Sequence, residues 1–154
     1  MIHIAVISDS HESEYVVQRL LQKEASANYI FHLGDGASVM ESYLAQCRAL
    51  VYQVAGNCDF IAACPTEREV TLGGISFLLT HGHGFGVKQG LGRLVAEAQK
   101  RGVQFAVFGH THAQHYTVHN GVHLLNPGSL KLGSYACIDI DDNGIPTVTM
   151  KQLY

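Results

Sequence analysis

Five short polar clusters along the chain carry side chains that bind divalent metal ions. They are Asp9-Ser10-His11, Gly34-Asp35, Gly56-Asn57-Cys58-Asp59, His81-Gly82-His83 and Gly109-His110-Thr111-His112. Imidazole and carboxylate groups suit divalent ions of intermediate softness, and an Asn can add a neutral carbonyl oxygen to the ligand set. Two such ions about 3.5–4 Å apart can clamp the attacking and leaving oxygens of an in-line phosphoryl displacement. The clusters therefore indicate metal-assisted chemistry on a phosphate group.

Each cluster directly follows a segment that reads as a buried β-strand. The apolar runs predict strands over residues 1–8, 29–33, 50–54, 75–80 and 104–108. In open α/β sheets, ligands bind beyond the carboxyl ends of the strands. We therefore expect the five clusters to converge at one edge of a sheet, where glycines let the backbone turn sharply beside the site.

The order of predicted elements places the chain in the α/β class. Helices are predicted over residues 14–27, 36–47 and 87–101, with Ser13 as the N-cap of the first. The β-α-β-α-β order of the first half favours a parallel sheet. Turn signals at Gly73-Gly74, Asn120-Gly121 and residues 141–144 predict hairpins, so the second half should be mostly antiparallel. We expect one domain over residues 1–154, without a cap domain, in which helices flank two packed mixed sheets.

Composition narrows the classes of partner and compartment. The 154 residues include 47% hydrophobic and 15% charged residues, and the formal net charge is -3. Without a basic run, the chain has no electrostatic footprint for a nucleic-acid duplex or an anionic membrane. It has no stretch of 18 apolar residues, no signal peptide and no C-x-x-C pair among its four cysteines. We therefore expect a cytoplasmic protein with reduced thiols.

The order of the five clusters resembles the calcineurin-like metallophosphoesterase family. That family shows D-x-H, G-D, G-N-[H/C]-[D/E], H-x-H and G-H-x-H in this order, and here the series spans Asp9 to His112. The G-N-C-D form and the segment Asn126-Pro127-Gly128-Ser129 are similar to its small bacterial and archaeal phosphodiesterase branch. Each motif alone is weak, but all five in order are specific.

The resemblance implies two metal ions with seven protein ligands. One ion would be held by Asp9, His11, Asp35 and His112, and the other by Asp35, Asn57, His81 and His110. Asp35 would bridge them, and His81 is preferred to His83 because it stands closer to the strand end. Two dications and two carboxylates leave a local charge of about +2, which a bridging hydroxide reduces to about +1. Such a site attracts an anionic ester although the whole chain is mildly acidic.

The resemblance also implies the reaction: in-line attack of the metal-bridging hydroxide on phosphorus. It assigns catalytic roles to Asn57, Asp59 and His83, and substrate contacts to His83 and Cys58. Many members carry His where this chain has Cys58, and that His is thought to protonate the leaving group. The identity of the general acid is therefore open here. We expect aryl esters to be cleaved more readily than alkyl esters, and diesters in preference to monoesters.

Several residues have simpler structural explanations. Asp9 could cap the following helix, Asn57 could serve only its turn, and His83 is equally compatible with a loop position. Other candidates fit structural roles better. A solvated hairpin face accounts for His115, His119 and His123, and core packing for His3, His32, Cys47, Cys137 and Phe85. A solvated helix accounts for Lys88 and Arg93.

A second function remains open alongside the enzyme. A retromer subunit built on the same fold has altered metal ligands and acts as a protein scaffold, so a catalytically weak metal-binding scaffold is the alternative. All seven ligand positions here carry competent residues, which favours catalysis. Mn is the expected metal, with Ni, Fe, Zn and Co also compatible. The substrate would be a small phosphodiester or nucleotide-like molecule, and exposed hairpin edges would allow a homo-oligomer.

Overall fold

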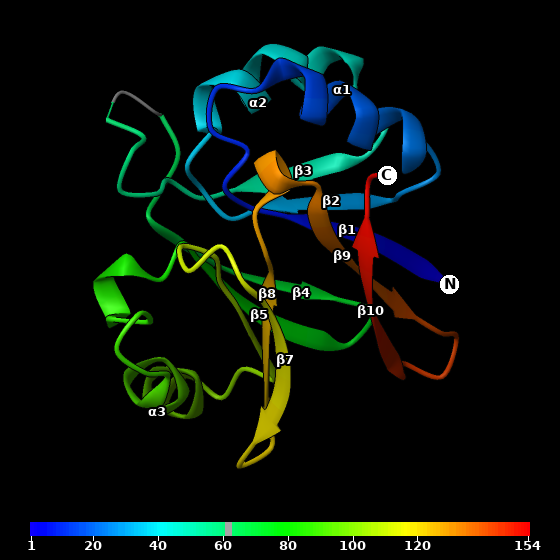
Figure 1. Ribbon diagram of the computed structural model, residues 1–154. Helices are drawn as coiled ribbons and strands as arrows, with labels where there is room; N and C mark the ends of the chain where they lie inside the picture. The colour runs from blue at the N-terminus through cyan, green and yellow to red at the C-terminus, as the bar shows by residue number, and fades with distance from the viewer. Residues whose placement is uncertain (61–62) are drawn as a thin grey trace.

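The computed structural model describes residues 1–60 and 63–154, which form two five-stranded β-sheets packed against each other (Figure 1). The first sheet has the order β10 (Pro146–Gln152), β9 (Ser134–Ile140), β1 (Ile2–Ile7), β2 (Tyr29–His32) and β3 (Leu50–Gln53). The second has the order β4 (Glu67–Leu72), β5 (Ile75–Thr80), β6 (Phe105–Val107), β8 (Val122–Pro127) and β7 (Gln114–His119). Both sheets mix parallel and antiparallel pairs.

Helices cover the outer faces of the two sheets (Figure 1). Helices α1 (Glu14–Lys23) and α2 (Ala37–Tyr43), with the 3-10 turn η1 (Leu44–Gln46), lie on the first sheet. Helix α3 (Gly92–Arg101) packs on the second sheet through Leu94, Val95 and Ala98. Two further 3-10 turns, η2 (His83–Phe85) and η3 (Leu130–Leu132), belong to loops. The predicted α/β fold of two mixed sheets flanked by helices is confirmed.

The main core lies between the sheets. Phe31 of β2 and Phe77 of β5 meet there with ring centroids 5.2 Å apart, and Phe77 lies 5.1 Å from Phe105 of β6. All three rings are fully buried. Burying such side chains stabilises the fold by about 1.5–3 kcal/mol each. The aromatic contacts hold the two sheets in a fixed relation, which matters because both sheets supply residues to the site described below.

The predicted strand directions are right for the first half and only partly right for the second. Strands β1, β2 and β3 are parallel, and the three predicted hairpins form as β4–β5, β7–β8 and β9–β10. However, β5, β6 and β8 run parallel in the second sheet. A turn signal reports only the pairing of its two flanking strands. It carries no information about the crossover through α3 that places β6 beside β5.

Helix boundaries also differ from the predictions. The third helix begins at Gly92 rather than at residue 87, because Gly90 adopts a positive φ angle of 144° that a helix cannot contain. The first helix ends at Lys23, four residues early, and Ser13 occupies its N-cap position without a side-chain capping bond. The second helix tightens into η1 after Tyr43.

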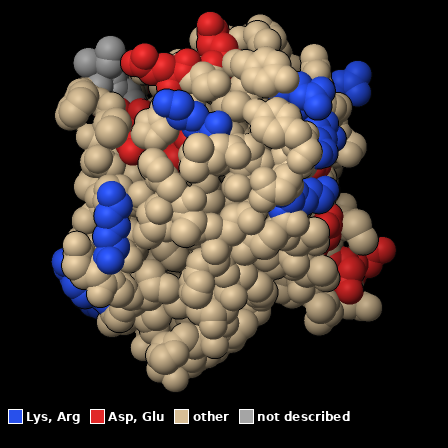
Figure 2. Space-filling view, viewed as in Figure 1, with Lys and Arg blue, Asp and Glu red and all other residues tan. Residues whose placement is uncertain are grey.

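Charged residues are dispersed on the face of the molecule shown in Figure 2. Lys and Arg occur there in small separate groups, and a broad area is free of charged side chains. This face therefore offers no continuous basic surface to a nucleic-acid duplex. Within residues 1–60 and 63–154, none of the helices has both the length and the apolar character needed to cross a membrane.

Candidate active site

The loop after β1 buries a carboxylate that is only half satisfied. Asp9 is fully buried, and its Oδ2 accepts hydrogen bonds from the Ser8 hydroxyl at 2.6 Å and the His110 backbone N–H at 3.1 Å. Its Oδ1 makes no hydrogen bond within the described part of the chain. It lies 3.2 Å from His112 Nε2 and 3.8 Å from His81 Nε2. A buried carboxylate oxygen without a partner is costly, so this position fits a bound cation.

A second cluster forms around His81, which follows β5 and is fully buried. His81 Nδ1 pairs with the Leu33 carbonyl oxygen at 2.7 Å. Because a carbonyl only accepts, Nδ1 carries a proton, so Nε2 is the nitrogen that can give its lone pair to a metal ion once it is deprotonated. Nε2 lies 3.3 Å from Asp35 Oδ2 and 3.2 Å from His110 Nδ1. Fixing one imidazole nitrogen on a backbone carbonyl so that the other is free is the usual arrangement of metal-binding histidines.

The structure thus brings six of the seven predicted ligands into two adjoining groups. Within each group the potential ligand atoms lie within 4.8 Å of one another. Asp35 also lies within this range of His11 and Cys58, so it sits between the two groups. The groups are Asp9, His11 and His112, and Asp35, His81 and His110.

Left-handed backbone conformations coincide with these ligands. Among the described residues other than glycine, six have positive φ, and five of the six are predicted metal ligands. The left-handed region disfavours residues with a Cβ atom, and such strain concentrates at functional sites. The five are Asp9 (54°), His11 (53°), Asp35 (59°), His110 (71°) and His112 (63°).

Asp59 holds the loops after β2 and β3 together. Its carboxylate accepts four backbone N–H groups, from Asp35 at 2.6 Å, Gly56 at 2.8 Å, Gly36 at 3.0 Å and Ala37 at 3.1 Å. Burial alone would raise the pKa of this carboxyl, but the four donors bring it below its usual value. With its oxygens occupied in this way, Asp59 orients Asp35 rather than presenting a free carboxylate to the site.

The end of β8 and the turn after it brace the two remaining loops, a role that the sequence alone did not reveal. Asn126 is fully buried, and its Nδ2 donates to the Gly109 carbonyl at 3.1 Å and to Thr111 Oγ1 at 2.8 Å. The Ser129 hydroxyl donates to the Asp9 carbonyl at 2.9 Å. A buried Asn in an Asn-Pro-Gly turn is the only sequence signal for these contacts.

The electrostatics of the ligand groups favour cation binding. Burial would raise the pKa of Asp35, but the His81 imidazole and the Cys58 backbone N–H lower it well below its usual range. Burial would lower the pKa of His81, but Asp35 and Asp9 raise it. His110 has a lowered pKa because of burial and the neighbouring His81. A proton on His81 therefore takes the place that a metal ion would take between these carboxylates.

A cleft of about 830 Å³ opens beside the ligands. One side of it is formed by His11, Asp35 and His112. Two large apolar side chains also line it, Phe60, which is 90% exposed, and Leu132, which is 68% exposed. Lys131, Cys58, Asp59, Glu12 and Ser129 complete much of its wall. Sequence reasoning missed Lys131 and Phe60, because neither belongs to a motif.

The other predicted site residues lie near the two groups. Asn57 is exposed, and its Nδ2 contacts Cys58 Sγ at 3.6 Å. Exposed His83 has its ring centroid 5.6 Å from that of His81 and 6.1 Å from that of His110. The explanation of Asp9 as a helix cap is wrong, because Ser13 holds that position.

The residues expected to be structural lie elsewhere. His123 stacks on Phe105 with centroids 4.3 Å apart, and Phe85 packs against the α3 side of the second sheet. His115 and His119 are exposed on β7. Cys137 is buried as predicted, but it contacts His3 and does not pack only against apolar groups.

Comparison with known proteins assigns this site to a family. The model of the calcineurin-like phosphoesterase superfamily domain matches residues 2–143. The chain belongs to that superfamily. The probable metallophosphoesterase YsnB of Bacillus subtilis is 32% identical to it over 148 residues, which cover 92% of this chain and 86% of YsnB. Membership of this family makes the protein a metal-dependent phosphoesterase.

Solved structures share the fold of this phosphoesterase. A novel archaeal phosphodiesterase matches 97% of the chain and 100% of its own length, with a TM-score of 0.73 at 16% identity. Vacuolar Protein Sorting 29 from Cryptosporidium parvum matches 98% of the chain and 97% of its own length, with a TM-score of 0.76 at 20% identity. At these identities the likeness concerns the fold alone.

Proposed function

We propose that this phosphoesterase is a dinuclear-metal phosphodiesterase. The observation that carries the proposal is the arrangement of six His and Asp side chains in two adjoining groups with Asp35 between them. The buried Oδ1 of Asp9 supports it, because no group within the described residues donates a hydrogen bond to that oxygen. A fold shared with an archaeal phosphodiesterase agrees with the diester reading.

The proposed ligand sets follow the two groups. Asp9, His11, Asp35 and His112 would hold one ion, and Asp35, Asn57, His81 and His110 the other. Asn57 is included because the family pattern places a ligand at this position. In the structure its amide lies beside Cys58. Divalent ions held there, with Mn the best candidate and Ni, Fe, Zn and Co compatible, supply a Lewis acid and a source of hydroxide near neutral pH. The protein's part is to fix the ligands through strained loops and through His81, Asp59 and Asn126.

The cleft indicates how a substrate would lie. Its ligand-lined side would receive the phosphoryl group, while Phe60 and Leu132 offer apolar surface to one substituent. Lys131 adds a positive charge for an anionic oxygen. A small diester with an aryl or nucleoside-like group has both features. We propose this class of substrate, bound in an open site within one domain over residues 1–154 that lacks a cap.

Three further residues have proposed roles next to the reacting groups. Burial and His81 lower the pKa of His83, so its neutral imidazole can hydrogen-bond a substrate oxygen at pH 7. For Cys58 we propose a substrate contact, because it lines the cleft and its backbone N–H donates to Asp35 Oδ1 at 2.8 Å. For Asp59 we propose a positioning role, because its oxygens are held by backbone donors.

The deciding experiment is hydrolysis of a chromogenic aryl phosphodiester and of the matching monoester. Metal-stripped protein would be tested with Mn²⁺, Ni²⁺, Zn²⁺ or Mg²⁺ added back. Asp35→Asn and His110→Ala should each lower diester turnover at least about 100-fold, because each removes a direct ligand. His115→Ala, an exposed histidine on β7, should retain full activity. Loss of activity in all three variants, or monoester cleavage alone, would contradict the proposed diesterase.

A second candidate function is a metal-binding scaffold with weak catalysis. The fold is shared with a protein named for vacuolar sorting and not for hydrolysis. Metal binding without turnover of either ester, in any of the four metals, would favour this function over the enzyme.

Location and assembly are proposed on narrower grounds. The four cysteines are free, which suits a reducing compartment, and we propose the cytoplasm. The edge strands β7 and β3 offer unpaired backbone groups, so a homo-oligomer is compatible with the fold. Partners other than a small substrate, such as a nucleic-acid duplex or a membrane, are not expected from the net charge of -3.

A further inference from the structure

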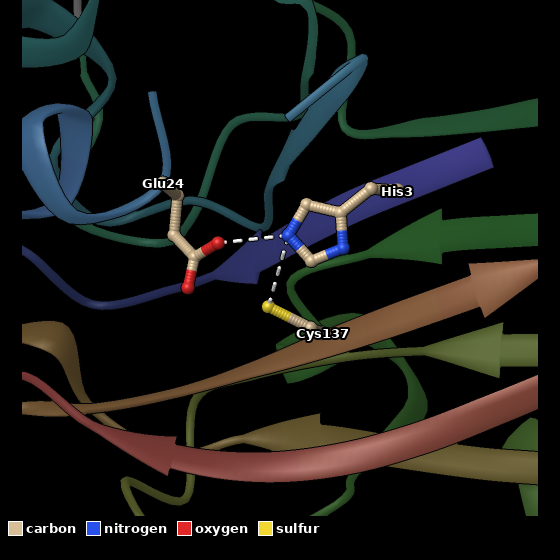
Figure 3. Close-up of side chains that lie close together, drawn as sticks. All are labelled: His3, Glu24 and Cys137. Atoms are coloured by element: carbon tan, nitrogen blue, oxygen red, sulfur yellow. Dashed lines mark hydrogen bonds and ion pairs between the residues drawn. The ribbon is translucent and has the colours of Figure 1, made fainter. Parts of the chain in front are cut away.

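A second polar cluster lies at the opposite end of β1 from the candidate active site (Figure 3). It consists of His3 of β1, Cys137 of β9 and Glu24, the C-cap residue of α1. Asp9 lies six positions after His3, just beyond the end of β1, which is up to about 20 Å along an extended chain. The cluster is therefore separate from the catalytic groups. It lies where the end of α1 packs onto the first sheet.

The three side chains present three different metal-binding atoms to one point. His3 Nε2 lies 2.8 Å from Glu24 Oε2 and 3.8 Å from Cys137 Sγ, and all three atoms lie within 4.8 Å of one another (Figure 3). Zn–N and Zn–O bonds of about 2.0 Å and Zn–S bonds of about 2.3 Å in tetrahedral geometry place such atoms roughly 3.3–3.6 Å apart. The two distances from His3 Nε2 are within about 0.5 Å of these values.

The surrounding residues already orient the ligand atoms. His3 Nδ1 pairs with Asp139 Oδ1 at 2.5 Å, which directs Nε2 toward Glu24 and Cys137. The other oxygen of Glu24 accepts from the Tyr135 hydroxyl at 2.6 Å and from Lys151 Nζ at 3.2 Å. A carboxylate behind the histidine and donors behind the ligating carboxylate are the outer contacts that zinc sites use to fix their ligands.

Charge and access are also compatible with a dication. Burial raises the pKa of the Cys137 thiol, so its thiolate would form only as the ion binds. Glu24, Asp139 and that thiolate would then carry three negative charges, which Lys151 and one dication neutralise. His3 remains 21% exposed at its side chain, whereas Cys137 is fully buried and Glu24 nearly so. An ion can therefore enter past His3. In its absence, a doubly protonated His3 ring donates from Nε2 to Glu24 and from Nδ1 to Asp139, so the Nε2 proton and the metal compete for one place.

We propose that His3, Glu24 and Cys137 form a zinc site that ties the end of α1 to strands β1 and β9. A thiolate, an imidazole and a carboxylate together favour Zn²⁺ over Mg²⁺ or Mn²⁺, and the fourth position is open for water. The site does not depend on the proposed function, because it shares no residue with the candidate active site.

The first test uses Co²⁺ as a spectroscopic probe of metal-stripped protein. Cobalt bound to a thiolate gives a near-ultraviolet charge-transfer absorption that cobalt bound to histidine and carboxylate lacks. Cys58 also lies near potential ligands, so Cys58→Ser is the matched control. We expect the band in the wild type and in Cys58→Ser, its loss in Cys137→Ser, and its displacement by Zn²⁺. A band that is absent from the wild type, or that persists in Cys137→Ser, would refute the site.

The second test counts bound zinc after equilibrium dialysis. Cys137→Ser should hold one ion per chain fewer than the wild type, whatever the active site retains. Because Cys137 is buried, His3→Gln at a partly exposed position provides a variant with less risk to folding, and it should show the same loss. Asp139→Asn should keep the cobalt band while weakening zinc affinity about 10–100-fold. Equal zinc content in the wild type, Cys137→Ser and His3→Gln, all with native circular dichroism, would mean that the cluster is only a hydrogen-bonded network.

Discussion

At the scale of single residues, the candidate site depends on side chains held in unfavourable surroundings. Asp9 has a buried oxygen without a hydrogen bond, and five of the seven metal-ligand candidates adopt left-handed backbone conformations. Each such feature costs free energy, of order 1–3 kcal/mol for a left-handed residue with a Cβ atom. Asp59 offsets part of this by accepting four backbone donors. The strain is compensated only because neighbouring loops define the geometry.

One residue-scale prediction concerns His32, which is fully buried in β2 beside the site. Burial lowers its pKa to about 4 from 6.5. Between pH 6.5 and about pH 4, His32 is protonated in the unfolded chain but neutral in the folded chain. The free energy of unfolding therefore falls as the pH is lowered from 6.5 to about 4. Urea unfolding of metal-stripped protein should show a smaller loss between pH 7 and pH 4 in His32→Gln, by up to about 3 kcal/mol. If the free energy of unfolding changed with pH by the same amount in the wild type and in His32→Gln, a neutral, buried His32 would be contradicted.

At the scale of elements, the site depends on close approach between a loop of one sheet and a loop of the other. Gly109 lies near the start of the loop after β6 and against Ser8 and Asp9 after β1, where a Cβ atom would collide with Ser8 Oγ and Asp9 Oδ2. Its backbone N–H also donates to the His81 carbonyl at 3.0 Å. The glycine is needed here for space rather than for a positive φ.

The matching prediction is that Gly109→Ala displaces Asp9 and His110 from each other. A misplacement of about 1 Å can lower turnover about 100-fold, and overpacking should cost about 1–3 kcal/mol of stability. Gly92→Ala is the control, because a Cβ atom there meets open space at the start of α3. We expect normal diester hydrolysis in the control and at least a tenfold loss of kcat/KM in Gly109→Ala. Equal kcat/KM in the two variants would contradict the prediction, because it would show that the loops accommodate the added Cβ atom without moving the ligands.

At the scale of the whole molecule, the candidate ligands come from both sheets. Asp9 and Asp35 follow β1 and β2 of the first sheet, while His81 and His110 follow β5 and β6 of the second. The shared aromatic core below them, centred on Phe77, fixes the relation of the two sheets. Ions bound to these ligands would therefore connect the sheets at the edge of that core.

Removal of metal should accordingly lower the stability of the whole fold. An ion present at 100 times its Kd stabilises the native state by about 2.7 kcal/mol, which is roughly 5–10 °C in Tm for a chain of this size. Thermal unfolding with and without a chelator checks this shift. Asp35→Asn should lose most of the difference, whereas Cys137→Ser should lose only the part due to the His3 cluster. A Tm that is insensitive to the chelator in the wild type would contradict bound ions at either place.

The sequence by itself determined the fold class, the parallel first half, the three hairpins and the chain order of the metal-binding residues. These features are local, because strand periodicity, turn residues and a polar side chain after a strand are properties of neighbouring positions. The structure places six of the seven predicted ligands in two groups, and their binding of metal remains a prediction.

Only the tertiary structure decided which distant segments meet. It placed β9 beside β1, put β6 parallel to β5 and β8, and set Asn126 against the loop that carries His110. It also brought His3 and Cys137, which sequence reasoning had assigned to the core, to Glu24. The contact between His3 and Cys137, for example, joins residues 134 positions apart. Such contacts depend on how apolar faces pack and on which buried polar atoms can find partners, and neither is encoded by spacing along the chain.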